Sequence, residues 1–193
     1  MKSSGRWLSV AAAWLIVVFG ASAQSQQKPH SSRHSAQDTA ASKTPASSAG
    51  VQLQELSRAL KKKNPASAYE KLSAFANHNS KNAYGARAAL ALGYYDYSKT
   101  NFGLAVKWLA RAQSEPLLRD YALYWNAETN IALSKQDDAI AQLQTLRADF
   151  PDSVMTDQAL ESLAGAAIAL NQPNIALEAL DAYPATKSKP ALL

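Results

Sequence analysis

The most constraining feature of the sequence is an alanine followed four positions later by a leucine, a pair that recurs along the chain. Ala105 and Leu109 form one copy. Ala139 follows Ala105 by 34 residues, Ala176 follows Ala139 by 37, and a leucine again stands four positions after each. Residues four apart lie on one helix face. A period near 34 residues indicates helical units that bury their apolar faces only by stacking on their neighbours.

A second small residue precedes each of these alanines by twelve positions, namely Gly93, Ala127 and Ala164. Small residues where two helices cross let the backbones approach closely. Glycine in a helix interior costs about 1 kcal/mol relative to alanine, so we expect Gly93 to be there for close packing. Ala68 and Leu72 provide an earlier copy of the pair, 37 residues before Ala105.

The rest of the helical region also predicts an all-α fold. Alanine-rich apolar stretches alternate with short polar segments such as "SKTN", "SKQD" and "NQPN", and no segment keeps a period of two. We expect seven or eight short helices in about four pairs. One helix begins at Val51 and ends at "KKKNP", and the next has Asn64 as its cap, Pro65 in its first turn and its end near Asn77.

The N-terminus predicts a secretory signal peptide over residues 1–23. Basic Lys2 and Arg6 precede an apolar run from Trp7 to Phe19, and small residues follow at 21–23. The apolar run is shorter than the roughly 20 residues that span a bilayer, although an uncleaved anchor is the alternative. We therefore expect an exported, periplasmic protein with no membrane span after cleavage.

Composition divides the remainder of the chain into three parts. Residues 24–50 are rich in Ser, Ala, Gln and Thr and predict a disordered linker. His30 and His34 have a helical metal-ligand spacing but lie in this linker without a third ligand, so we expect no metal site. Residues 51–184 form the repeat region. Residues 185–193 are predicted to be the start of a further element or a truncated tail. The sequence would then be a truncated product or a fragment of a longer protein.

Charge and motifs argue against several functional classes. Removing Lys2 and Arg6 lowers the formal net charge from +5 to +3, and the basic residues do not alternate with aromatics along a face, so nucleic acid is not an expected partner. The chain has no cysteine and no GxSxG, HExxH, P-loop or GxGxxG motif. Glu128 and Glu161 could be acids by residue type only, and solvated helix carboxylates are the preferred interpretation. We expect no enzyme activity and no cofactor.

The repeat resembles the tetratricopeptide repeat family, whose unit is two antiparallel helices of about 34 residues in all. The residues that carry the resemblance are Leu92, Gly93, Phe102, Ala105, Leu109 and Ala112, then Ala127, Ala139, Leu143 and Pro151, then Leu163, Ala164, Ala176 and Leu180. The chain departs from the family pattern at Asp96, Asn126 and Asn130. The resemblance implies a TPR-like right-handed superhelix, an α-solenoid of about four helix pairs, over residues 51–184.

In that family the first helix of each pair lines a concave groove. Carried over by register, the predicted groove and partner-binding residues are Arg87, Tyr94, Tyr97, Tyr121, Tyr124 and Glu128. Tyr95 and Trp125 would fall on other faces and pack between helices. Two interpretations stay open, either that all the aromatics are packing residues or that the four tyrosines form a recognition surface.

A second resemblance is to the N-terminal helical superhelix of soluble lytic transglycosylases, carried by residues 88–133, 150–164 and 182–193. It implies a non-catalytic scaffold beside peptidoglycan in the cell envelope. The catalytic glutamate of those enzymes lies in a separate domain, and nothing in this chain matches that domain's motifs, so no catalytic residue is carried over. The alternative is a stand-alone adaptor for envelope proteins. The expected partner is another protein or the remainder of the same chain, with peptidoglycan as a further candidate.

Overall fold

The computed structural model describes residues 45–62 and 65–182, with side chains from residue 48 onward. These residues form helices and no strand, which confirms the all-α prediction for the described part of the chain. The helices are α1 (Pro45–Ala59), α2 (Ala66–His78), α3 (Ala83–Ser98), α4 (Phe102–Ala112), the short 3-10 helix η2 (Pro116–Leu118), α5 (Arg119–Ala132), α6 (Gln136–Asp149), α7 (Thr156–Ala169) and α8 (Pro173–Asp181).

The first helix begins at Pro45, six residues before the predicted start at Val51. Proline suits the first position of a helix, and alanine and serine neighbours do not oppose helix formation. The helical region therefore includes the last six residues of the predicted linker. The predicted signal peptide, the linker up to residue 44, the Asn64 cap and the tail at 185–193 lie outside the described residues.

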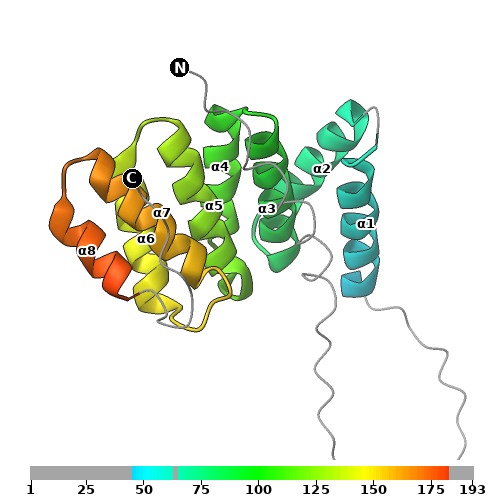
Figure 1. The fold of residues 1–193 in the computed structure, drawn as a ribbon. Helices are drawn as coiled ribbons and strands as arrows, with labels where there is room; N and C mark the ends of the chain where they lie inside the picture. The colour runs from blue at the N-terminus through cyan, green and yellow to red at the C-terminus, as the bar shows by residue number, and fades with distance from the viewer. Residues whose placement is uncertain (1–44, 63–64, 183–193) are drawn as a thin grey trace, which may run out of the picture. The chain divides into compact units, whose positions relative to one another are not determined.

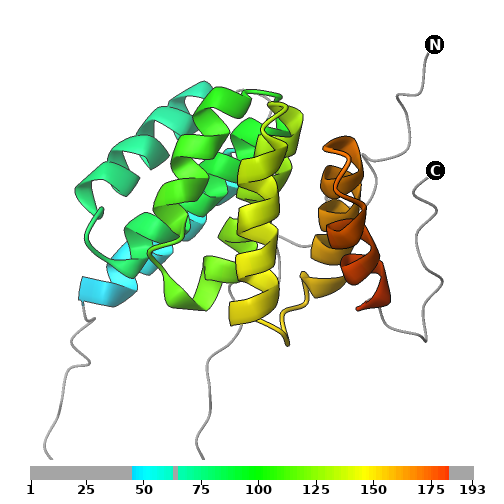
Figure 2. The ribbon, with the colours of Figure 1, turned by 90° about the vertical axis from the view of Figure 1, so that its left-hand side faces the viewer.

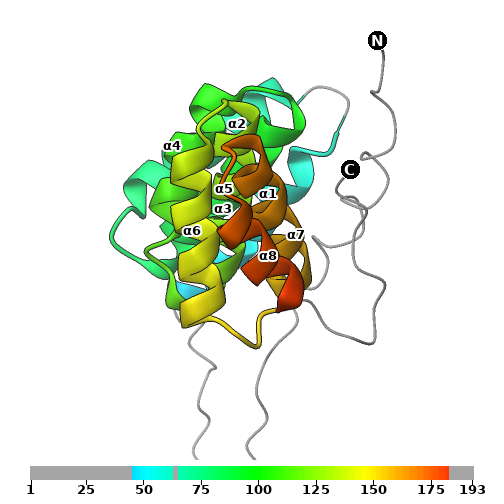
Figure 3. The same cartoon turned by 60° about the vertical axis from the view of Figure 1, so that its left-hand side comes forward.

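The helices pack mainly against their neighbours in the chain (Figure 1 and Figure 2). Contacts join α1 to α2, α3 to α4, α5 to α6 and α7 to α8, and further contacts join each of these hairpins to the next. Figure 3 shows the last of these neighbours, α6, α7 and α8, alongside one another. The odd-numbered helices also touch across hairpins, because α1 contacts α3, α3 contacts α5 and α5 contacts α7.

Three hairpins close with the same turn. Thr100, Ser134 and Asn171 adopt left-handed backbone angles, with φ of 61°, 58° and 56°. In each case the next residue's N–H donates to a carbonyl five positions earlier, for example Asn101 to Asp96 at 2.8 Å. A left-handed residue after the last helical turn satisfies carbonyls that would otherwise lack a donor. The three turns repeat after 34 and then 37 residues, which is the spacing of the alanines that the sequence repeat predicts.

The small residues of the repeat are buried, and one of them lies at a close crossing between the two helices of its hairpin. Ala105, Ala139, Ala127 and Ala164 are fully buried. At Gly93 of α3 a Cβ atom would lie 2.5 Å from the Leu109 Cγ of α4, so only glycine fits without a shift. Close packing at Gly93 is therefore confirmed.

The hydrophobic core has three clusters. One lies in α1, α2 and α3 and is centred on Leu53, Leu72 and Leu92. A second lies in α5 to α8 and includes Leu143 and Leu163. A third, made of alanines at 89, 112 and 122, joins α3, α4 and α5. Because alanines alone bury little area at this junction, the partly buried aromatics nearby contribute a larger share of its stability.

A polar network around the buried Asp96 adjoins the first of these clusters, against which Tyr69 and Trp108 pack. The Tyr69 hydroxyl donates to Asp96 Oδ2 at 2.7 Å, and the Trp108 indole N–H donates to the Tyr69 oxygen at 3.1 Å. The Asn101 side chain donates to Asp96 Oδ1 at 3.3 Å. Burial raises the pKa of Asp96 above its ordinary value, while the hydrogen bonds from Tyr69 and Asn101 lower it in part. Asn130 occupies the matching position of the next hairpin and is also buried.

Gly93→Ala should lower the free energy of unfolding by about 1–2 kcal/mol, because overpacking against Leu109 exceeds the gain in helix propensity. Gly165→Ala in α7 is the matched control, since its Cβ would meet nothing within 4 Å. That variant should gain about 0.5–1 kcal/mol. Urea unfolding followed by circular dichroism measures both, and a gain in stability for Gly93→Ala would contradict the close-packing role.

Asp96→Asn should keep the acceptor for Tyr69 and remove the cost of a buried charge. A raised pKa in the folded state means that the native protein binds the proton more tightly than the unfolded chain. The stability contributed by Asp96 is therefore present at low pH and is lost as the pH rises through the folded-state pKa. We expect the variant to equal or exceed the natural chain in unfolding free energy at pH 7, with the advantage disappearing near pH 4. Urea titrations at the two pH values test this, and a loss of stability at pH 7 would show that the charge itself is stabilising.

Candidate functional site

The most distinctive group of side chains is an aromatic cluster between α3 and α5, made of Tyr94, Tyr97, Tyr124 and Trp125. Trp125 lies at its centre. The centroid of its ring system is 4.8 Å from the ring centroid of Tyr94, 5.2 Å from that of Tyr97 and 5.1 Å from that of Tyr124. Tyr97 also lies 5.8 Å from the ring of Phe102. All four members are half-buried, so the aromatic cluster packs the two hairpins together and still presents ring surface to solvent.

A carboxyl group adjoins this cluster at the contact between α5 and α7. Glu128 Oε1 accepts a hydrogen bond from the Ser162 hydroxyl. Burial raises the pKa of Glu128, the bond from Ser162 lowers it in part, and the charge of Glu161 raises it again. Among the described residues, none of the ion pairs includes Glu128.

The tyrosines beside Glu128 are held in their neutral form. Burial raises the pKa of Tyr97 to about 12, and the charges of Glu128 and Tyr94 add to the shift. Burial, followed by the charge of Glu128, also raises the pKa of Tyr124. Their hydroxyls therefore stay neutral at any physiological pH and can both donate and accept hydrogen bonds.

The structure brings four of the six predicted groove residues together and gives the other two different neighbours. Tyr94, Tyr97 and Tyr124 share Trp125, and Glu128 lies close enough to affect two of them electrostatically.

Arg87 instead pairs with the buried Glu115 in the connection before η2, with 3.7 Å between a guanidinium nitrogen and a carboxylate oxygen. Tyr121 packs, partly buried, against the core of α5 to α8.

Tyr95 and Trp125, which were expected to lie on other faces, have different surroundings from one another. Tyr95 packs between helices, with its ring centroid 5.7 Å from that of Tyr69. Trp125 packs between α3 and α5 but belongs to the same surface as the predicted tyrosines. The helical repeat alone could not place Trp125, because a large ring reaches neighbours on either side of its own helix stripe.

Ser162 is a further residue that the sequence analysis did not include. It follows Glu128 by 34 residues, the length of one repeat. Residues one repeat apart on equivalent helices lie on adjacent units, so this spacing was the signal that could have identified it.

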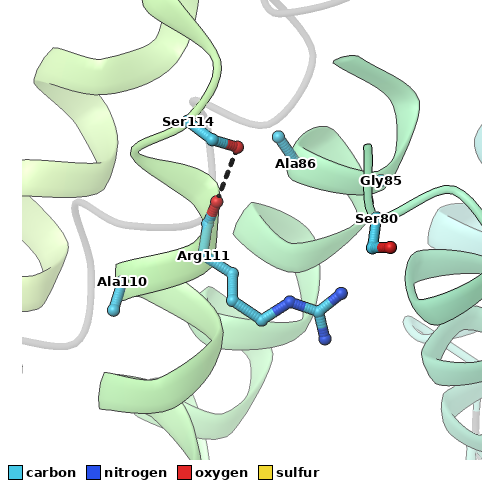
Figure 4. A pocket seen from close by; sticks show the side chains of 6 residues that line it. All are labelled: Ser80, Gly85, Ala86, Ala110, Arg111 and Ser114. Atoms are coloured by element: carbon cyan, nitrogen blue, oxygen red, sulfur yellow. Dashed lines mark hydrogen bonds between the residues drawn. The ribbon is translucent and has the colours of Figure 1, made fainter. Parts of the chain in front are cut away.

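A separate shallow pocket of about 250 Å³ lies between α4, the first turn of α3 and the connection that precedes α3 (Figure 4). It is lined by Ser80, Gly85, Ala86, Ala110, Arg111 and Ser114. The guanidinium of Arg111 donates to the Asn77 side chain at 2.8 Å and to the Ala76 carbonyl at 3.1 Å, and it lies 4.7 Å from the Trp108 ring centroid. The one charged group of this pocket is therefore already used to join α4 to α2.

No protein-family model matches the chain, and no curated protein or solved structure matches it significantly. Within the residues that the structure describes, no three potential ligands are grouped as a metal site would need. No helix in the same part of the chain has the length and apolar character needed to cross a membrane.

Trp125→Ala should destabilise the fold more than Tyr94→Ala, because it removes the ring contacts of Trp125 with Tyr94, Tyr97 and Tyr124, and Tyr94→Ala removes only the first of these three. Each aromatic pair contributes about 0.5–1.5 kcal/mol. We therefore expect the unfolding free energy to fall by about 2–4 kcal/mol in Trp125→Ala and by about 1 kcal/mol in Tyr94→Ala. Urea denaturation of the two variants measures the difference. Equal losses would mean that Trp125 is not the centre of the packing between α3 and α5.

Proposed function

We propose that the protein is a non-catalytic, exported scaffold of the cell envelope that binds an extended or helical segment of a protein partner. In this proposal the helix pairs form a TPR-like α-solenoid, and the partner lies across α3, α5 and α7. The observation that carries the proposal is the aromatic cluster with its adjoining Glu128. It joins three odd-numbered helices through side chains that are only half-buried.

The arrangement of the hairpins supports the TPR-like part of the proposal. The sequence repeat and the three left-handed turns share spacings of 34 and 37 residues. Contacts between odd-numbered helices of successive hairpins are expected where these helices line the inner side of a curved array. A partner bound there would touch side chains from several repeats at once.

The chemistry of the aromatic cluster supports binding. Tyrosine and tryptophan provide large contact areas with little loss of side-chain entropy, and they dominate the energetics of many protein interfaces. The neutral hydroxyls of Tyr97 and Tyr124 add hydrogen-bonding groups that need no counterion.

The cellular setting rests on sequence features. The predicted signal peptide supports export, and the resemblance to lytic transglycosylases supports a position beside peptidoglycan as the helical region of such an enzyme. A stand-alone adaptor for envelope protein assembly is the alternative. The two differ in the partner, which is the remainder of the same chain in the first case and a different protein in the second.

Site-specific photo-crosslinking in cells tests the proposal. The full chain carries p-benzoylphenylalanine in place of Tyr97, and irradiation should give a cross-linked species of one defined mass. Mass spectrometry of that species shows whether the partner is a different polypeptide or further sequence of this chain. Tyr124→Ala in the same background should lower the yield about thirtyfold, because an aromatic hot spot is worth about 2 kcal/mol or more.

The matched control carries the photoreactive residue at Glu70, an exposed position on α2. A similar pattern of products from positions 70 and 97, or an unchanged yield in the Tyr124→Ala variant, would count against binding at the aromatic cluster.

A further inference from the structure

Glu128 is a half-buried carboxylate that accepts a hydrogen bond from a hydroxyl and, among the described residues, takes part in none of the ion pairs. Ser162 fixes one carboxylate oxygen, the rings of Tyr97 and Tyr124 lie nearby, and the neighbouring charge is that of Glu161. The ion pairs of the described residues use other carboxylates, namely Glu115, Asp149 and Glu178. A partly buried charge without a partner is costly, and a bound cation would offset that cost.

Gly165 leaves open space on the face of α7 that carries Ser162. It lies three residues after Ser162 in α7, so the two positions are neighbours on one helix face. A Cβ atom at Gly165 would meet nothing within 4 Å. By repeat register Gly165 corresponds to Glu128 itself and to Tyr94, because each follows the small residue of its hairpin directly. The α7–α8 hairpin therefore has an open space where the α3–α4 and α5–α6 hairpins place a large side chain.

We propose that Glu128, Ser162, Tyr97 and Tyr124 form a recognition site for a lysine side chain of the partner polypeptide. This inference deepens the proposed function and rests on it. The ammonium group would be the counterion of Glu128, and its methylene stem would lie along the tyrosine rings toward the open space at Gly165.

Lysine fits this chemistry for two reasons. Its ammonium group has three donors and no acceptor, which suits a carboxylate flanked by tyrosine hydroxyl oxygens. Aromatic faces attract cations, and the apolar stem of lysine packs well on rings while its charged end reaches a polar group. Arginine shares the charge but needs a planar, two-pronged acceptor, whereas one oxygen of Glu128 is already used by Ser162.

Peptide titration of the full chain by NMR tests the inference, with the Trp125 indole signal as reporter. The probes are the peptide acetyl-Gly-Leu-Lys-Leu-Gly-amide and the same peptide with norleucine in place of lysine. The lysine peptide should shift the Trp125 signal saturably and bind about tenfold more tightly than the norleucine peptide, as expected for one charge-assisted hydrogen bond. Glu128→Gln should remove that preference. Glu70→Gln, at an exposed carboxylate on α2, should leave it unchanged.

A second variant keeps the test valid if Glu128→Gln does not fold. Gly165→Leu fills the open space without changing any charge, and it should lower the affinity for the lysine peptide by a similar factor. Equal binding of the two peptides to the natural chain would overturn lysine recognition and leave the proposed binding surface standing. Binding of neither peptide would also overturn it, while cross-linking at Tyr97 would still decide the proposed function. Putrescine binding as tightly as the lysine peptide would overturn a polypeptide source for the ammonium group.

Discussion

The close contact between Gly93 of α3 and Leu109 of α4 is the constraint on which the described structure depends. Without a side chain at Gly93, the two helices of this hairpin come close enough to bury Ala105 and Leu109 completely. The next residue, Tyr94, is turned about 100° around the helix, and its ring contacts Trp125 of α5. Packing within one hairpin thereby sets which side chains reach the next.

The junction between α3 and α5 is made differently from the two larger core clusters. Those clusters, in α1 to α3 and in α5 to α8, are mainly buried leucines and alanines, whereas α3 and α5 meet through a small alanine cluster and half-buried aromatic rings. Aromatic pairs stabilise through specific geometry as well as buried area. The same residues can therefore join the repeats and remain available to a partner, so packing and recognition are not exclusive roles for these tyrosines.

Among the described residues, electrostatics separates the buried carboxyl groups of Asp96 and Glu115 from the half-buried one of Glu128. Asp96 is surrounded by donors from Tyr69 and Asn101, and Glu115 has Arg87 nearby, so both carboxyl groups have partners within the fold. Glu128 has one hydroxyl donor and a neighbouring charge of the same sign. Because an incompletely compensated charge is the costlier arrangement, Glu128 is the carboxyl group with most to gain from a ligand.

The sequence by itself determined the helical class, the spacing of the hairpins and the close packing at Gly93, since these follow from local periodicity and residue size. It also selected Tyr94, Tyr97, Tyr124 and Glu128, because repeat register places equivalent positions on adjacent units. Only the tertiary structure decided that Trp125 is the centre of the aromatic cluster and that Arg87 pairs with Glu115 instead of joining it. The physical reason is that long and bulky side chains choose partners through rotamers and neighbouring charges, which helix periodicity does not encode.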